Sequence, residues 1–186
     1  MASSFLPKTW CSSQPLLAQA DASAGTYDLA VQGFGGGGSE AAAGLGTWFF
    51  STRANQSQRF AALLDYADLW WASAFAGYFA KSALMTQLWV WGVTENQWVA
   101  RSLGSPFWKD SIASSGGGWA EIGDFPTGEG GRISNETFFS AAPNSWYLCW
   151  VWSDADIYTS GAQGSSSSAA STQVSVSVPF VVFGNL

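Results

Sequence analysis

Residues 174–182 have the sequence VSVSVPFVV, in which every second side chain is apolar. Alternation with period two is typical of a β-strand that has one face against a core and one face in water. Pro179 interrupts the stretch and has no amide hydrogen, so we expect this strand to lie at a sheet edge or to contain a bulge. The stretch is the strongest period-two pattern in the chain, and it predicts a β-fold.

Strand-like segments also occur in earlier parts of the chain. Residues 26–32 alternate in polarity, and residues 47–51 are rich in aromatic side chains and follow Gly44 and Gly46. Residues 146–152, WYLCWVW, are apolar in both alternate sets, which predicts a strand covered on both faces. The tetrapeptides LWVW at 88–91 and CWVW at 149–152 are similar, but four residues do not establish a repeat.

The stretch Phe60–Val93 is almost continuously apolar and allows three interpretations. Its Ala and Leu content and a spacing near 3.6 residues favour a helix, whereas its Trp and Val content favours consecutive long antiparallel strands. A membrane span over residues 69–93 would place Lys81 near its centre, at a cost of about 3 kcal/mol. Because the flanking segments are strand-like, we favour strands and keep a helix within 60–80 as the alternative.

These patterns together predict an all-β, mainly antiparallel fold, a single-domain β-sandwich or jelly roll formed by residues 25–186. Residues 1–24 are rich in Ser, Ala and Gln and are expected to form an irregular N-terminal arm. The glycine-rich runs at 35–38 and 116–131 are expected to be connections between strands. They lack the following Lys-Ser or Lys-Thr of a phosphate-binding loop.

The composition limits the classes of function. Charged residues make up 11% of the chain and hydrophobic residues 47%, with 12 Trp and 13 Phe. Soluble domains carry about 25% charged residues, so we expect much of this surface to be buried between subunits. The net charge is −6 and the seven basic residues are scattered singly, which disfavours nucleic acid as a partner.

The sequence contains no histidine, which removes the common nucleophile triads, histidine-based zinc sites and the commonest general base at neutral pH. Acidic residues at 121, 124, 129 and 136 could act in pairs, but we interpret them as solvated loop residues. Asp154 and Asp156 lie two residues apart and lack the further oxygen ligands of a calcium loop. We therefore predict a protein that is not an enzyme, with no metal and no cofactor.

The tryptophans fall into two groups by their sequence surroundings. Residues inside apolar runs are expected to be core or subunit-interface anchors, foremost Trp89, Trp91, Trp150 and Trp152. Residues in more polar, Gly- and Ser-containing segments are expected to form a ligand-facing aromatic platform, namely Trp98, Trp108 and Trp119.

The two cysteines, Cys11 and Cys149, are too few for a disulfide scaffold, and Cys149 is expected to be a small buried hydrophobe. The apolar run around Leu16 is too short for a signal peptide, so a route to the cell exterior or to a particle surface would not use one.

The leading functional prediction is a structural or assembly protein, a β-sandwich subunit that buries aromatic surface in a homo-oligomer, shell or filament. The alternative is a carbohydrate-binding recognition module. A membrane-active, toxin-like protein that uses residues 60–93 ranks third, and a carboxylate-based enzyme ranks fourth. The expected partners are copies of the chain itself or a glycan.

Overall fold

The computed structural model describes residues 5–11, 15–52, 56–75, 77–102, 105–113, 118–123, 128–161 and 167–185. All regular secondary structure in these ranges is β-strand, which confirms the predicted all-β class. The strands are β1 (Leu6–Cys11), β2 (Pro15–Asp21), β3 (Thr26–Phe34), β4 (Gly37–Ser51), β5 (Gln56–Ala74), β6 (Phe79–Gly92), β7 (Gln97–Arg101), β8 (Ser105–Ala113), β9 (Ala120–Gly123), β10 (Glu129–Ala141), β11 (Ser145–Thr159) and β12 (Ser168–Asn185).

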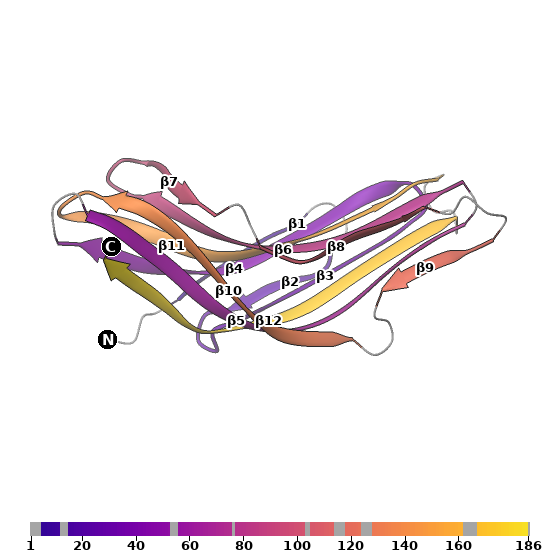
Figure 1. The fold of residues 1–186 in the computed structure, drawn as a ribbon, viewed down its shortest axis with the longest axis horizontal. Coiled ribbons are helices and arrows are strands. Elements are labelled where there is room, and N and C mark those ends of the chain that lie inside the picture. Colours follow the sequence, from indigo (N-terminus) through magenta and orange to yellow (C-terminus); the bar gives the residue numbers. More distant parts are fainter. Residues whose placement is uncertain are drawn as a thin grey trace.

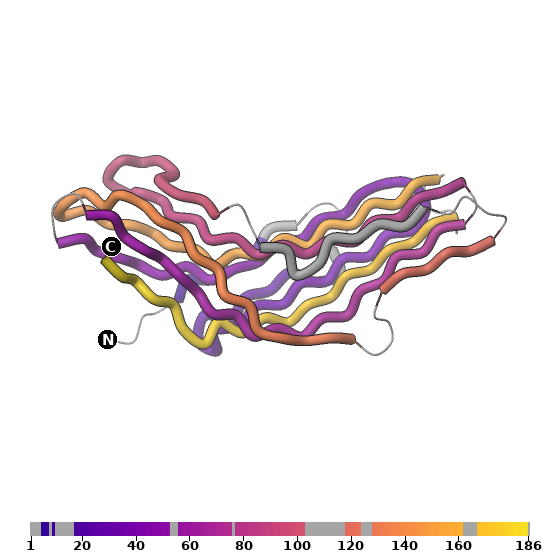
Figure 2. Tube along the Cα trace, viewed as in Figure 1, coloured from indigo at the N-terminus to yellow at the C-terminus, as the bar shows by residue number. Residues whose placement is uncertain are grey.

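The strands form two antiparallel sheets that pack face to face along an elongated molecule (Figure 1). Sheet A has the order β1-β4-β11-β6-β7, and β8 pairs with the part of β6 that β7 leaves open. Sheet B has the order β10-β5-β12-β3-β2, and β9 pairs with the end of β5. The longest strands run along most of the molecule (Figure 2), so each of them contributes to both ends of the sandwich.

The ambiguous stretch Phe60–Val93 folds into most of β5, a turn, and all of β6. The alternative of a helix within 60–80 is therefore wrong, and consecutive long strands are confirmed. Pairing with β10 on one side and β12 on the other outweighs the helix propensity of its Ala and Leu residues. The described part of the chain contains no helix of the length and hydrophobicity that crossing a membrane requires.

Pro179 lies in a strand at the centre of sheet B, between β5 and β3. The register between β12 and β5 shifts between Ser177 and Phe180, so Pro179 sits in an irregularity of the ladder. The expected bulge is confirmed. β12 is an inner strand as far as Ser177, where its pairing with β3 ends, and from Phe180 onward it pairs with β5 alone. The shift removes the need for a ladder hydrogen bond from the proline nitrogen.

Three segments that were expected to be irregular form strands. Residues 1–24 contain β1 and β2, which pair with β4 and β3 respectively. β4 begins within the first glycine run, at Gly37, and continues to Ser51, so it is much longer than the predicted strand at 47–51. The second glycine-rich run contains β9 and the start of β10. In each case pairing with a neighbouring strand provides the order that local composition does not indicate.

The core between the sheets differs at its two ends. At one end it consists of large aromatic side chains, namely Phe49, Phe60, Phe139, Tyr147 and Phe183. At the other end it consists mainly of alanine, namely Ala41, Ala72, Ala74, Ala80, Ala155 and Ala170. Each aromatic side chain removes far more apolar area from water than an alanine does, so the aromatic end provides more of the hydrophobic stabilisation per residue.

Polar side chains connect the two sheets in the middle of the core. The hydroxyls of Tyr27 on β3 and Ser153 on β11 are 2.6 Å apart, and both residues are fully buried. Ser82 on β6 forms a hydrogen bond with Thr172 on β12 in the same way. Because an unpaired buried hydroxyl is costly, these contacts favour one register of sheet A on sheet B.

Substitution of Tyr27 by Phe is expected to lower the free energy of unfolding by about 1–3 kcal/mol, because it leaves the buried Ser153 hydroxyl without this partner. Urea denaturation measures the difference. Tyr158→Phe is the control, since Tyr158 is exposed. Equal stability of the two variants would contradict a stabilising role for the hydrogen bond between the sheets.

Candidate functional site

The outer face of sheet A carries a set of seven indole rings. The side chains come from four neighbouring strands, β4, β11, β6 and β7. We call this surface the tryptophan face, and it consists of Trp48, Trp146, Trp150, Trp152, Trp89, Trp91 and Trp98.

Strand alternation and register place these rings on one side. In β11, Cys149 and Val151 point into the core, so Trp150 and Trp152 point outward. Trp150 pairs directly with Trp89 on β6. The similar tetrapeptides LWVW and CWVW are therefore antiparallel neighbours in the sheet, and both direct their tryptophans to the outer face.

The rings contact one another across the strands. Trp89 stacks on Trp152 with a centroid distance of 5.8 Å and an interplanar angle of 27°. Trp98 on β7 packs edge to face against Trp89 at 5.3 Å and against Trp91 at 4.9 Å. Aromatic pairs of this kind add about 0.5–1.5 kcal/mol beyond the burial of their area. The rings of Trp89, Trp91, Trp98 and Trp152 therefore form a packed layer rather than a set of independent side chains.

Two glycines of β4 make room for the rings of β11. A Cβ at Gly46 would lie 2.8–2.9 Å from three carbon atoms of the six-membered ring of Trp150. A Cβ at Gly44 would lie 2.8 Å from the Trp152 ring and 2.3 Å from the carbonyl oxygen of Val151. Both rings thus lie against the bare backbone of β4, which explains why glycines occur inside a long strand.

Hydrogen bonds fix the orientation of two indoles. Trp152 donates its Nε1 hydrogen to Oδ1 of Asp154 at 2.7 Å, and Trp89 donates to Oε1 of Gln87 at 2.7 Å. Gln87 in turn donates through Nε2 to Oδ2 of Asp154 at 3.0 Å. Asp154 therefore accepts from one indole directly and supports the other through an amide.

Asp154 is a half-buried carboxyl group. Burial raises its pKa above the ordinary value, and the nearby Glu40 carboxylate raises it further, while the hydrogen bond from Trp152 acts in the opposite direction. Desolvation disfavours the charged form of an acid, which is the physical cause of the first effect. The group that orients the indoles is thus itself sensitive to pH.

Arg101 closes the β7 side of the face. Its guanidinium carbon lies 4.6 Å from the centroid of Trp89 and 4.8 Å from that of Trp98. Cation–π contacts at such distances contribute about 0.5–1 kcal/mol at exposed sites. The contact attaches the short strand β7 to β6 beyond its few ladder pairs.

The tryptophan face has a buried part and an exposed part. Trp150 and Trp152 are 8% and 5% exposed, so they belong mainly to the body of the monomer. Trp48 and Trp146 are 45% and 48% exposed, and their rings meet edge to face at 6.1 Å. With Val93 they line a shallow apolar hollow. The exposed part lies over the aromatic end of the core.

The structure places the seven predicted site residues as follows. The predicted interface anchors Trp89, Trp91, Trp150 and Trp152 lie together on the tryptophan face, where Trp98 joins them. Trp119 immediately precedes β9 and packs against Phe75 at 5.6 Å. Figure 1 shows β7 and β9 at opposite ends of the molecule, so Trp98 and Trp119 do not share a platform. Trp108 is on β8, whose side chains lie outside the described part of the structure.

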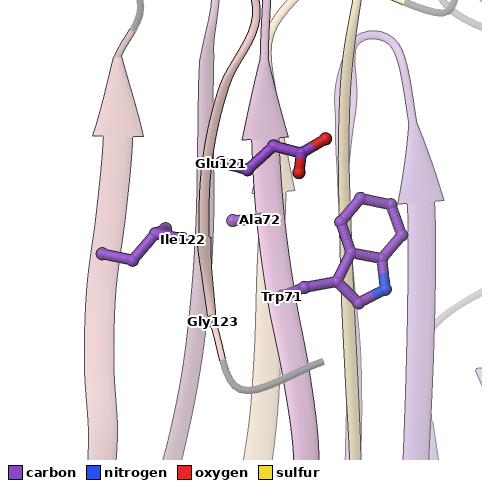
Figure 3. Close-up of a pocket in the computed structure, with 5 residues that line it drawn as sticks. All are labelled: Trp71, Ala72, Glu121, Ile122 and Gly123. Atoms are coloured by element: carbon purple, nitrogen blue, oxygen red, sulfur yellow. The ribbon is translucent and has the colours of Figure 1, made fainter. Parts of the chain in front are cut away.

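A pocket of about 400 Å³ lies where β5 pairs with β9 (Figure 3). Trp71 and Glu121 project from one side of this pair of strands and Ile122 from the other. Glu121 is the one carboxylate among the described residues that line it. These residues do not provide the two carboxyl groups that glycosidic hydrolysis uses.

The other acids and the cysteines have structural surroundings. Asp156 pairs with Lys81 on the outer face of sheet A, next to Asp154. Within the described ranges, no three His, Cys, Asp or Glu residues gather as a metal site would require. Cys149 is a free, buried thiol, as predicted for a small hydrophobe, and burial raises its pKa. The side chain of Cys11 lies outside the described residues.

Sequence reasoning missed Trp48 and Trp146, the two most exposed tryptophans of the face, and the polar residue Gln87. The sequence does show Gly44 and Gly46 just before Trp48, which hints at a strand that large rings could lie against. Only the register shows that these glycines lie beside the tryptophans of β11.

No protein-family model and no curated protein matches this sequence. Among solved structures, the enzymatically active domain of tailspike protein 4 of bacteriophage CBA120 aligns at 9% identity and a TM-score of 0.33, over 99% of this chain and 20% of that chain. A carbohydrate-binding module of the β-sandwich superfamily aligns at 6% identity and a TM-score of 0.22, over 94% of this chain and 56% of that chain. These TM-scores are too low for either likeness to support an inference.

Substitution of Gly46 by Ala is expected to displace the Trp150 ring, because the new methyl group would overlap it. Overpacking of this kind costs about 1–3 kcal/mol, and near-ultraviolet circular dichroism should report the altered packing of the indoles. Gly184→Ala is the matched control, since a Cβ there meets nothing within 4 Å. Identical spectra and stabilities of the two variants would contradict the packing of Trp150 on Gly46.

Lowering the pH from about 7 to about 4 is expected to raise the free energy of unfolding of the wild type relative to that of Asp154→Asn. The pKa of Asp154 is higher in the folded state, so its stabilising contribution is complete below the unfolded-state pKa and is lost as pH rises through the folded-state pKa. Asp21→Asn should show the opposite sign, because hydrogen bonds from Ser23 and Ala24 lower the pKa of Asp21. Urea denaturation at several pH values tests both.

Proposed function

We propose that this protein is a non-catalytic structural subunit that assembles with further copies of itself through the exposed part of the tryptophan face. The observation that carries the proposal is the exposure of the Trp48–Trp146 pair and of Trp98, which lies on β7 across β11 and β6 from that pair; the three side chains are 45%, 48% and 37% exposed at one end of sheet A. Exposed clusters of large apolar side chains on a sheet face are typical of interaction surfaces.

The rigidity of the face supports this function. Trp98 contacts indoles and a guanidinium that are already held in place by stacking and hydrogen bonds, and Trp48 and Trp146 pack against each other. Side chains that are ordered before association lose less conformational entropy when a partner binds. A larger share of the free energy from burying apolar area, about 25 cal/mol per Å², is then available for association.

Charged groups play a small part in the proposed contact. Arg101 lies on the β7 side of the tryptophan face, whereas Glu40 lies beside Asp156 further along β4, away from the exposed rings. The low charge of the whole chain also limits repulsion between copies.

The purified protein is expected to have a solution mass above the 19.7 kDa of the monomer by light scattering across a dilution series. Trp48→Ser combined with Trp146→Ser should shift the distribution to the monomer, because it removes the exposed apolar cluster. Phe180→Ser is the matched control, since Phe180 is an exposed aromatic residue on sheet B.

A wild-type protein that stays monomeric at every concentration would overturn the proposal. A Phe180→Ser variant that dissociates as readily as the tryptophan double variant would move the interface to sheet B.

A further inference from the structure

The hydrogen bonds of the tryptophan face form one chain, Trp152–Asp154–Gln87–Trp89, which we call the indole relay. An indole nitrogen can only donate, so Trp89 requires the oxygen of the Gln87 amide, which lies at 2.7 Å. The same amide then presents its nitrogen to Oδ2 of Asp154 at 3.0 Å, and Oδ1 of Asp154 accepts from Trp152 at 2.7 Å. The relay is therefore complete only while both oxygens of Asp154 accept.

Protonation of Asp154 adds a donor to a chain that has no acceptor for it. An ionised carboxylate accepts at both oxygens, whereas a protonated one carries an O–H group. A proton on Oδ1 would face the N–H of Trp152, and a proton on Oδ2 would face the N–H of Gln87. Half a turn of the Gln87 amide lets its oxygen accept from Oδ2–H. The amide nitrogen then faces the N–H of Trp89, so Trp89 loses its acceptor.

Burial and a neighbouring carboxylate favour the binding of a proton by Asp154. The charged residues on the surrounding strands are Asp156 on β11, Glu40 on β4 and Lys81 on β6, with Lys8 on β1, Arg101 on β7, and Lys109 and Asp110 on β8 one strand further out. The side chains of residues 8, 109 and 110 lie outside the described part of the structure. Asp156 is paired with Lys81. Burial and then Glu40 raise the pKa of Asp154, and the hydrogen bond from Trp152 only partly opposes them.

Trp89 holds the part of the tryptophan face that lies toward β7. Its ring stacks on Trp152 at 5.8 Å and packs against Trp98 at 5.3 Å, and the guanidinium carbon of Arg101 lies 4.6 Å from its centroid. Trp89 is half-buried, so a turn of its ring toward the surface lets water accept from the indole N–H. Such a turn breaks contacts that hold Trp98, whose side chain is 37% exposed.

We propose that Asp154, Gln87 and Trp89 form a proton-controlled switch that sets the position of Trp98 on the tryptophan face. With Asp154 ionised, the indole relay is complete and Trp98 is held. When Oδ2 takes a proton from solvent, the Gln87 amide turns, and Trp89 and Trp98 leave their packed positions. The effect of the switch on assembly rests on the proposed function: acid loosens an exposed ring of the contact surface and weakens the association.

Asp154→Asn imitates the protonated state, because the amide of Asn offers one acceptor and one N–H donor in place of two acceptors. This variant is expected to hold Trp89 in its acid-form position at every pH. Asp21→Asn is the matched control, since it removes the same charge from an exposed turn between β2 and β3. Thermal unfolding shows that each variant is folded.

The first measurement is a titration of the indole N–H signals of ¹⁵N-labelled protein from about pH 8 to about pH 4. It uses the full chain with Trp48→Ser and Trp146→Ser, which is expected to be monomeric, so that the result does not depend on assembly. Trp89→Phe and Trp152→Phe identify the two signals. The signals of Trp89 and Trp152 are expected to shift together, with one midpoint above the ordinary value for an aspartate.

Gln87→Leu tests the relay, because it separates Trp89 from Asp154 and leaves Trp152 bonded to Asp154. In this variant the Trp152 signal should still titrate and the Trp89 signal should not. A Trp89 signal that does not move in the parent, or that still titrates in Asp154→Asn, would overturn the switch. A Trp89 titration that survives in Gln87→Leu and disappears in Glu40→Gln would place the proton between two carboxyl groups, and the relay through Gln87 would be wrong.

The second measurement is the solution mass at about pH 7 of two variants with the same formal charge, Asp154→Asn and Asp21→Asn. The dissociation constant of the assembly is expected to be about tenfold higher for Asp154→Asn, as for the loss of one aromatic contact. Equal constants, with indole signals that titrate, would overturn the effect on assembly and leave the proposed function in place. A wild type that is monomeric throughout overturns the proposed function, and the indole titration still decides the switch.

Discussion

The packing of two tryptophan rings on two glycines organises the outer half of sheet A. Trp150 and Trp152 can lie against β4 only because Gly46 and Gly44 carry no side chain. With these rings in place, Trp89 stacks on Trp152, Trp98 packs on Trp89, and Arg101 covers both. The register between β4 and β11 is thereby linked to the shape of the surface.

The inner face of the same sheet is packed in a different way. Apart from Phe49 and Tyr147 at the aromatic end, its residues are mainly aliphatic or small, and the two sheets are joined by hydroxyl pairs such as Tyr27 with Ser153. Burial raises the pKa of Tyr27, so its hydroxyl remains a neutral partner for Ser153. Hydrogen bonds in the core and ring packing on the outer face each favour one pairing register of the strands. Long strands could otherwise shift along one another, so both kinds of contact help to fix the fold.

The tryptophan face and the small pocket at the end of the sandwich share one end of the molecule but differ in chemistry. The tryptophan face offers exposed apolar rings and few charges, which favours association with another protein surface. The end pocket is lined by neutral amides beside Phe49 and Phe183. Phe50 touches both, because it lines the pocket and packs against Trp146.

The sequence by itself determined the all-β class, the strands over 26–32 and 174–182, and the division of residues 146–152 into two faces. Period-two alternation is a local property, and local patterns can be interpreted without knowledge of the partner strand. The tetrapeptides LWVW and CWVW were visible in the sequence, but their pairing with each other was not.

Only the tertiary structure decided the rest, because strand pairing joins residues far apart in the chain. Ala- and Leu-rich β5 is a strand since β10 and β12 flank it, and β4 extends through its glycines because β11 covers them. Strand pairing also places Trp48, Trp98 and Trp146 on the same outer face of sheet A. It brings Gln58 into contact with Asn185, which is 127 residues away in the sequence. Composition predicted a surface rich in aromatic residues, whereas register determined where that surface lies.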